Sequence, residues 1–186
     1  MKPYDPAWGI AVGRKIQQWT KSIDPLNLRP FYPLPDVPST YEGMRDTMNS
    51  TYFRGFPYPV YSVGCETSIY GSEDANHAFR FMHDWVHVRM DLGFDLVSEM
   101  KVAEKQLDIL FLFLNYAEDW VFRIDTQGQA LYSFLTDGEF LKDQAAFVQW
   151  VYEEARRLRT NSSEEDYNDA QILQQAVYSY YLEHKQ

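Results

Sequence analysis

Apolar residues recur every three or four positions from about residue 73 almost to the end of the chain, and this pattern constrains the fold more than any other feature. It predicts helices near residues 73–91, 95–122, 127–136, 141–159 and 164–184. Residues that break helices separate these segments: Gly93, Asp125 to Gly128, Asp137-Gly138 and Asn161 to Ser163. A mainly α, helical-bundle-like core over residues 73–186 follows from this pattern.

The N-terminal part, residues 1–72, is less regular and rich in proline and tyrosine. Residues 7–23 carry an apolar stripe at helical spacing, so we predict a helix there. The five prolines of residues 24–38 exclude a regular helix, and the apolar residues between them favour an extended arm that packs along the domain. A proline segment that binds a partner is the alternative. Ser39 and Glu42 predict a capped helix to about Met48, and Val60 to Val63 predict a short strand or a loop.

Bulk properties restrict the class of protein. A chain of 186 residues with 45% hydrophobic residues suits one cored domain, here residues 1–186. The net charge of −10 gives no strong signal for nucleic-acid binding. The start of the chain lacks the apolar core of a signal peptide, and the longest apolar run, Ile109 to Leu114, is far too short to span a membrane. We therefore expect a cytoplasmic protein.

Three of the four histidines lie within eleven residues of one predicted helix. At about 100° per residue, His83 and His87 lie one turn apart at the margin of the apolar face. Two imidazoles at this spacing can reach one metal ion. Asp84 points about 100° away from His83, so we predict a catalytic base or an orienting group rather than a ligand. We expect His77, which is out of phase with the apolar face, to be solvated or to cap the helix.

The next predicted helix supplies a carboxylate at the same level. Glu99 lies at the edge of the apolar face, about six residues beyond the turn at Gly93, and His87 lies about six residues before it. If the two helices form an antiparallel hairpin, His83, His87 and Glu99 can bind one ion and leave positions open for water or substrate. Half-buried histidines in a polar network are the alternative. Two histidines and one carboxylate suit zinc, iron and manganese alike.

The segment Phe79 to His87 reads FRFMHDWVH, and Gly93-Phe94 and Glu99 follow it. This order resembles a pattern, FRxxHDxxH followed by a GF step and a GE pair, of uncharacterised bacterial and bacteriophage proteins. Ser98 stands where that pattern has the glycine before the glutamate. The resemblance implies a helical fold in a bacterial cell or an infected host, and it implies no particular reaction. The segment is also similar to the HExxH helix of zinc peptidases, with Asp84 in place of their glutamate.

Two functions follow as hypotheses. The first is a metal-dependent hydrolase in which His83, His87 and Glu99 hold a divalent ion, a bound water is the nucleophile and Asp84 is the base. An iron enzyme that uses oxygen is a less favoured form of this hypothesis. The second is a viral or bacterial structural or interaction protein in which these residues form a polar network. The expected partners are accordingly a small-molecule substrate or another protein, and a homo-oligomer is left open.

Overall fold

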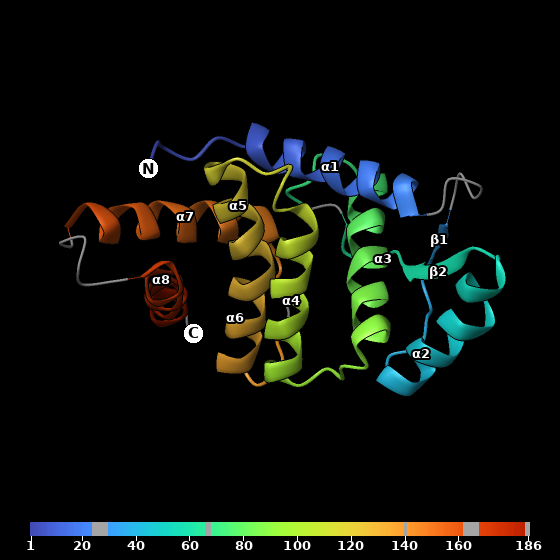
Figure 1. Ribbon diagram of the computed structural model, residues 1–186. Helices are drawn as coiled ribbons and strands as arrows, with labels where there is room; N and C mark the ends of the chain where they lie inside the picture. Colours follow the sequence, from blue (N-terminus) through green and yellow to red (C-terminus); the bar gives the residue numbers. More distant parts are fainter. Residues whose placement is uncertain (24–29, 66–67, 140, 162–167, 185–186) are drawn as a thin grey trace.

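The computed structural model describes residues 1–23, 30–65, 68–139, 141–161 and 168–184, and helices make up most of them, as Figure 1 shows. The mainly α fold class predicted from the sequence is therefore confirmed. The elements in chain order are α1 (Ala7–Ile23), β1 (Phe31–Leu34), α2 (Tyr41–Ser50), η1 (Tyr52–Arg54), β2 (Tyr58–Tyr61), α3 (Glu73–Met90), α4 (Leu96–Leu110), α5 (Tyr116–Arg123), η2 (Ile124–Gly128), α6 (Gln129–Leu135), α7 (Gln144–Asn161) and α8 (Asp169–His184).

The central helices run side by side and α1 lies across their ends. In Figure 1, α3, α4 and the continuous α5–α6 rod stand roughly parallel, with α1 above them. The α7–α8 pair packs against one side of this layer, and α2 with the small sheet packs against the other. Helix α3 therefore contacts α1, α2, α4 and both strands, so very little of its circumference is free to face solvent.

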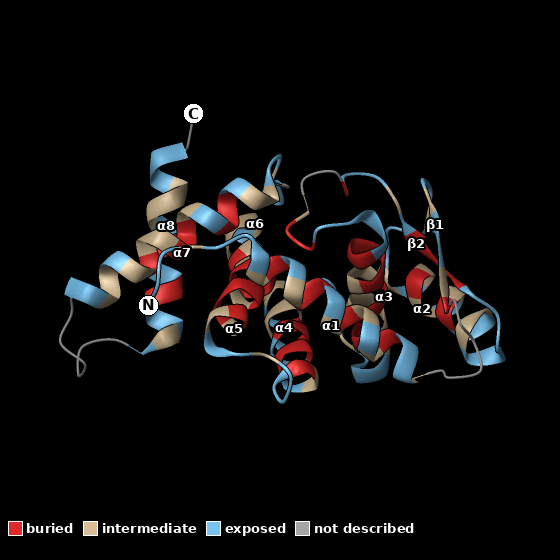
Figure 2. Cartoon of the chain, turned by 90° about the horizontal axis from the view of Figure 1, so that it is seen from above, coloured by how far each residue is buried: buried red, intermediate tan, exposed pale blue. Residues whose placement is uncertain are grey.

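Two clusters of buried side chains hold these elements together. The larger one includes Trp120, Phe122 and Phe147 and joins α1 and α3 to the helices that follow them. The smaller one includes Phe81 of α3, whose ring stacks on Phe31 of β1 at 5.6 Å between centroids. Figure 2 shows that the buried residues follow the inner faces of the helices. The described part of the proline-rich arm thus packs onto α3, as predicted, while residues 24–29 lie outside the described residues.

Helix α1 approaches the segment before α3 very closely. A Cβ atom added at Gly13 would stand 2.6 Å from the carbonyl oxygen and 2.8 Å from the Cβ of Tyr70. Such distances are far below van der Waals contact, so only glycine fits there. Glycine has a low helix propensity, yet at this position its lack of a side chain is what allows the helix to pack.

One predicted helix is two helices in the structure. Residues 95–122 were expected to be continuous, but α4 ends at Leu110 and α5 begins at Tyr116. The reason is a capping box: the Asn115 side chain accepts hydrogen bonds from the backbone of α5, and the Glu118 carboxylate accepts one from the Asn115 backbone N–H at 2.8 Å. These polar contacts start a new helix, although the apolar period continues through the turn.

The break predicted at Asp125 to Gly128 is wrong. The chain continues from α5 to α6 through a π-helical turn, η2, in which Asp125 is 3% exposed. Its carboxylate accepts hydrogen bonds from the Tyr70 hydroxyl at 2.5 Å and from Gln129 Nε2 at 2.6 Å. The wide turn therefore keeps a polar residue inside the protein without ending the helix.

The remaining sequence predictions differ from the structure mainly at their ends. Helix α2 is capped by Thr40, whose hydroxyl accepts from the backbone N–H of Gly43 at 3.2 Å, and not by Ser39 with Glu42. Strand β2 starts at Tyr58, two residues before the predicted start, and pairs in parallel with β1. The predicted start of the last helix falls in residues 162–167, outside the described residues.

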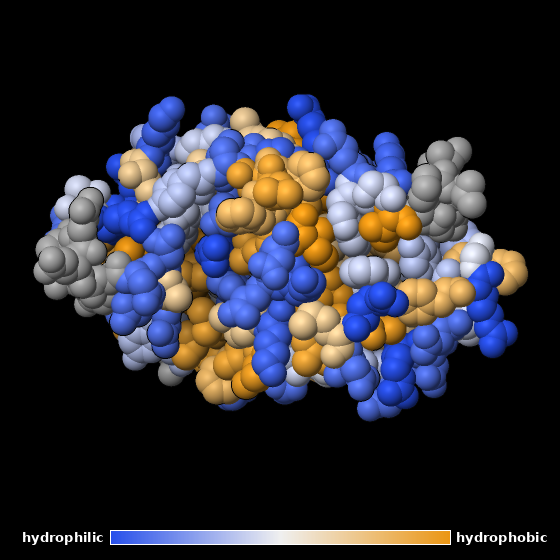
Figure 3. All heavy atoms as spheres, viewed as in Figure 1, coloured by the Kyte–Doolittle hydropathy of each residue, from blue (hydrophilic) through white to orange (hydrophobic). Residues whose placement is uncertain are grey.

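No helix among the described residues is long and apolar enough to cross a membrane. The surface does carry an apolar run at the turn between α4 and α5, where Phe111, Leu112 and Phe113 are 70%, 86% and 58% exposed. Figure 3 is drawn in the same view as Figure 1. It shows hydrophobic side chains in the upper middle of this face, where α4 and α5 are joined.

Candidate metal centre

The end of α3 fixes the orientation of His87. Asp91 caps this helix in the left-handed conformation, with φ of 53°, and accepts a hydrogen bond from the Tyr41 hydroxyl at 2.6 Å. This turn brings the Leu92 carbonyl back to within 2.9 Å of His87 Nδ1. A carbonyl oxygen can only accept, so Nδ1 of His87 carries a proton. In the neutral ring Nε2 then has a free lone pair, which is the form that binds a metal.

The start of α4 places Glu99 opposite the two histidines. Asp95 caps the helix by accepting from the backbone N–H groups of Val97 and Ser98, both at 3.1 Å. Glu99 follows within the first turn, where the positive end of the helix dipole favours a negative charge. The predicted hairpin pivot at Gly93 is correct, because α3 and α4 pack against each other and are joined by residues 91–95.

The three predicted ligands meet at one point. The Nε2 atoms of His83 and His87 lie 3.0 Å apart, and Glu99 Oε1 is 3.4 Å from His87 Nε2. Glu99 Oε2 is 3.5 Å from His83 Nε2. One ligand atom from each residue lies within 4.8 Å of the others, so the group is close enough to hold a metal ion. Side-chain exposures of 29% for His83, 24% for Glu99 and 0% for His87 leave one side of the group open to solvent.

The protonation preferences of the group follow from burial and from charge. Burial lowers the pKa of the His83 imidazole to about 4, although the Glu99 charge opposes this. Burial also lowers the pKa of His87, but the hydrogen bond and charge of Glu99 outweigh it, so the net shift is upward. Burial raises the pKa of Glu99, but its contacts with the two histidines lower it further. The carboxylate is thus held ionised beside two imidazoles.

The structure does not bring Asp84 into this group. Its carboxylate accepts a hydrogen bond from the Tyr58 hydroxyl of β2 at 2.9 Å, on the side of α3 that faces the sheet. Burial raises the pKa of Asp84 to about 6, against the opposing effect of the Tyr58 hydrogen bond. Its role as a base therefore stays a prediction, and the contact with Tyr58 gives Asp84 a structural function of its own.

His77 is buried, so the expectation of a solvated or capping residue is wrong. The residue is 5% exposed, and its Nε2 has no hydrogen-bond partner among the described residues. Ser72 provides the cap instead, by accepting from the Ala75 backbone N–H at 3.2 Å. The helical projection failed here because it assumed one apolar face, whereas α3 is covered by α1 and the sheet as well as by α4.

Sequence reasoning missed Gln106 of α4. This residue is 0% exposed and lies against the His83 imidazole. The only signal in the sequence is its spacing: seven residues after Glu99 is two helical turns, which returns to nearly the same face. A single glutamine in phase with a proposed ligand is too common to be noticed before the packing is known.

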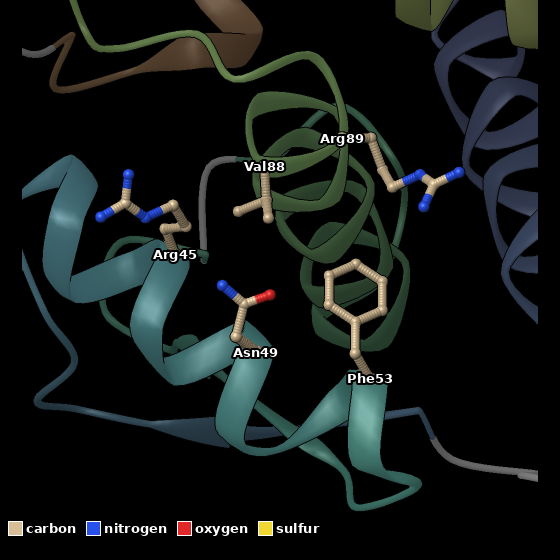
Figure 4. A pocket seen from close by; sticks show the side chains of 5 residues that line it. All are labelled: Arg45, Asn49, Phe53, Val88 and Arg89. Atoms are coloured by element: carbon tan, nitrogen blue, oxygen red, sulfur yellow. The ribbon is translucent and has the colours of Figure 1, made fainter.

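A separate hollow between α2, η1 and α3 lacks a convergent set of polar groups. Figure 4 shows its lining, which consists of Arg45, Asn49, Phe53, Val88 and Arg89. The two guanidinium groups extend in opposite directions. Arg45 lies 5.7 Å from the centroid of the Tyr41 ring, and Arg89 lies 5.6 Å from that of Trp85. No residue of the histidine–glutamate group lines this hollow.

Comparison of the chain with models of known protein families, with curated proteins and with solved structures gave no significant match. The resemblance to bacterial and bacteriophage proteins therefore stays a prediction. The group formed by His83, His87 and Glu99 is the feature of the structure that indicates a function.

Proposed function

We propose that this protein is a divalent-metal-dependent hydrolase whose ion is bound by His83, His87 and Glu99. The observation that carries the proposal is the spacing of the donor atoms, 3.0 Å, 3.4 Å and 3.5 Å. Ligands at about 2.0–2.1 Å from an ion stand about 2.8–3.0 Å apart when adjacent in octahedral geometry and about 3.3–3.4 Å apart in tetrahedral geometry. The side chains already stand at these separations, so binding requires little rearrangement.

The surroundings of the group support a reactive rather than a purely structural ion. Structural zinc sites have four protein ligands, whereas reactive sites have three and an open position. Here three ligands converge, and two of them, His83 and Glu99, border solvent. An ion in such a site lowers the pKa of a bound water toward about 7 and so supplies a nucleophile near neutral pH. The chain contributes the orientation: Leu92 fixes the proton of His87, and Glu99 is fixed by the start of α4.

A polar network that ties α3 to α4 is the second candidate, and one contact favours it. The 3.0 Å contact between the two Nε2 atoms is itself a hydrogen bond, and it needs no ion. In that case the group acts as a link within the hairpin of a structural or interaction protein. If the group binds an ion, adding metal raises the stability of the protein and removing it lowers the stability. If the group is only a polar network, neither treatment changes the stability.

The test is metal content and Zn²⁺ titration of the full chain. We expect about one ion per chain, with binding lost in His83→Ala and in Glu99→Ala. His184→Ala is the matched control, because that imidazole is exposed and stacks on Tyr180 at 4.0 Å between centroids. A bound ion also raises the unfolding temperature in proportion to the logarithm of its concentration relative to Kd. A chain that takes up no Zn²⁺, Fe²⁺ or Mn²⁺ would refute the metal site and favour the network.

Hydrolysis is tested separately, with metal-loaded protein and simple ester, phosphodiester and peptide substrates. Activity that disappears in Glu99→Ala and persists in His184→Ala supports the proposal. An ion that binds without any hydrolysis across these substrates leaves a metal-binding protein and removes the hydrolase assignment.

A further inference from the structure

The side-chain amide of Gln106 is buried without well-formed hydrogen bonds. It is 0% exposed, and neither Nε2 nor Oε1 has a hydrogen-bond partner among the described residues. An unpartnered buried amide destabilises the fold, because the group gives up its hydrogen bonds to water and gains none in return. A leucine of similar volume would avoid this cost, as Leu107 and Leu110 do on the same helix. The polar side chain is thus a burden on the fold unless it has a partner in another state of the protein.

The position of Gln106 relates it to the candidate metal centre. It follows Glu99 by two turns of α4, about 10 Å along the helix axis, on the face that packs against α3. His83 precedes His87 by one turn on the antiparallel partner, so it lies between the levels of Glu99 and Gln106. The His83 Nε2 atom faces His87 and Glu99, and the carboxamide of Gln106 lies against the same imidazole.

The two histidines have the same chemical requirement. An imidazole that binds an ion through Nε2 carries its proton on Nδ1, and an acceptor for that N–H fixes the tautomer and the orientation of the ring. His87 has this acceptor in the Leu92 carbonyl, at 2.9 Å. For His83 the corresponding group is Gln106: its side chain is close enough to raise the pKa of the imidazole as a hydrogen bond does, although neither amide atom of Gln106 forms a well-aligned hydrogen bond within the described residues.

We propose that Gln106 is a positioning residue of the metal centre, whose Oε1 accepts the Nδ1–H of His83 when His83 Nε2 binds the ion. This inference rests on the proposed function. Loading the site satisfies the buried carboxamide and fixes the tautomer and orientation of His83. The two histidines then have equivalent supports, one from a backbone carbonyl and one from a side chain.

A purely structural role of Gln106 and a positioning role predict opposite changes in the stability of the metal-free protein when the residue is replaced. In Gln106→Leu the unpartnered amide is gone, so the metal-free protein unfolds at an equal or higher urea concentration. The Zn²⁺ affinity of the same variant falls about 10- to 100-fold, the usual effect of losing a group that orients a metal-binding histidine. Gln106→Glu keeps an acceptor oxygen and retains most of the affinity. Leu110→Ala is the control: it is fully buried one turn further along α4, so it lowers stability without changing affinity.

The experiment is a Zn²⁺ titration against a competing chelator, paired with urea unfolding of the metal-free chain. If the wild type binds and Gln106→Leu binds within twofold of it, the role of Gln106 is refuted while the metal site stands. If Gln106→Leu loses affinity and Gln106→Glu does not recover it, the loss comes from packing, and the inference is wrong. If the wild type binds no metal, the proposed site fails, and this inference fails with it.

Discussion

Replacing Asp125 by asparagine is expected to make the protein more stable relative to wild type at neutral pH than in acid. Asp125 is 3% exposed in the π-helical turn, and burial raises its pKa to about 6, against the opposing hydrogen bonds of Tyr70 and Gln129. The carboxyl group therefore releases its proton at a higher pH in the folded chain than in the unfolded chain. The fold carries an electrostatic cost whenever the solution is basic enough to ionise this carboxyl group.

The sign and size of this pH effect follow from the thermodynamic linkage between protonation and folding. A carboxyl whose pKa is higher in the folded than in the unfolded chain stabilises the fold below the unfolded pKa, and this stabilisation is lost as the pH rises through the folded pKa. From 3.8 to about 6 is a shift of about 2 units, and each unit corresponds to about 1.4 kcal/mol. The full cost of ionisation is thus about 3 kcal/mol. About 2 kcal/mol of it develops between pH 4.5 and 7.5.

The assay is urea unfolding of wild type and Asp125→Asn at both pH values. The variant's free energy of unfolding, relative to wild type, is expected to rise by about 2 kcal/mol from pH 4.5 to pH 7.5. Comparing this difference at the two pH values cancels the hydrogen bond that asparagine forms less well and all other titrating groups. Asp46→Asn is the matched control, since it makes the same substitution at a side chain that is 75% exposed. A flat difference for Asp125→Asn would show that folding does not raise the pKa of this carboxyl group.

Two further predictions test helix packing and capping. Gly13→Ala is expected to destabilise the protein despite the better helix propensity of alanine, because its Cβ would meet the Tyr70 carbonyl oxygen at 2.6 Å. In Gly128→Ala the nearest atoms are 3.5 Å away, so this matched variant should unfold at an equal or higher temperature, and equal losses for both would contradict the close approach. Thr40→Ala is expected to cost about 1 kcal/mol through loss of the cap on α2, measured by urea unfolding. Ser39→Ala should leave the free energy of unfolding unchanged. A larger loss for Ser39→Ala than for Thr40→Ala would show that Ser39 caps the helix, as the sequence predicted.

The sequence determined that the fold is mainly helical and that His87 and Glu99 lie at matching positions along the paired helices. Apolar spacing alone located α1, α3 and α7 closely, and the distances of His87 and Glu99 from Gly93 were enough to bring their side chains together. These predictions succeeded because helix periodicity and rise are local properties that each segment carries by itself.

The tertiary structure decided which polar residues are buried and what they contact, which the apolar periodicity of the sequence could not show. Asp125 is a turn former by its local preference, yet the Tyr70 hydroxyl, 55 residues away in the chain, keeps it inside a continuous helix. His77 is polar and out of phase with the apolar face, yet contacts on several sides of α3 bury it. The support of each candidate ligand, Leu92 for His87 and Gln106 for His83, depends on where the chain turns and which faces meet. Such contacts between distant segments have no periodic signature, so only the packed structure reveals them.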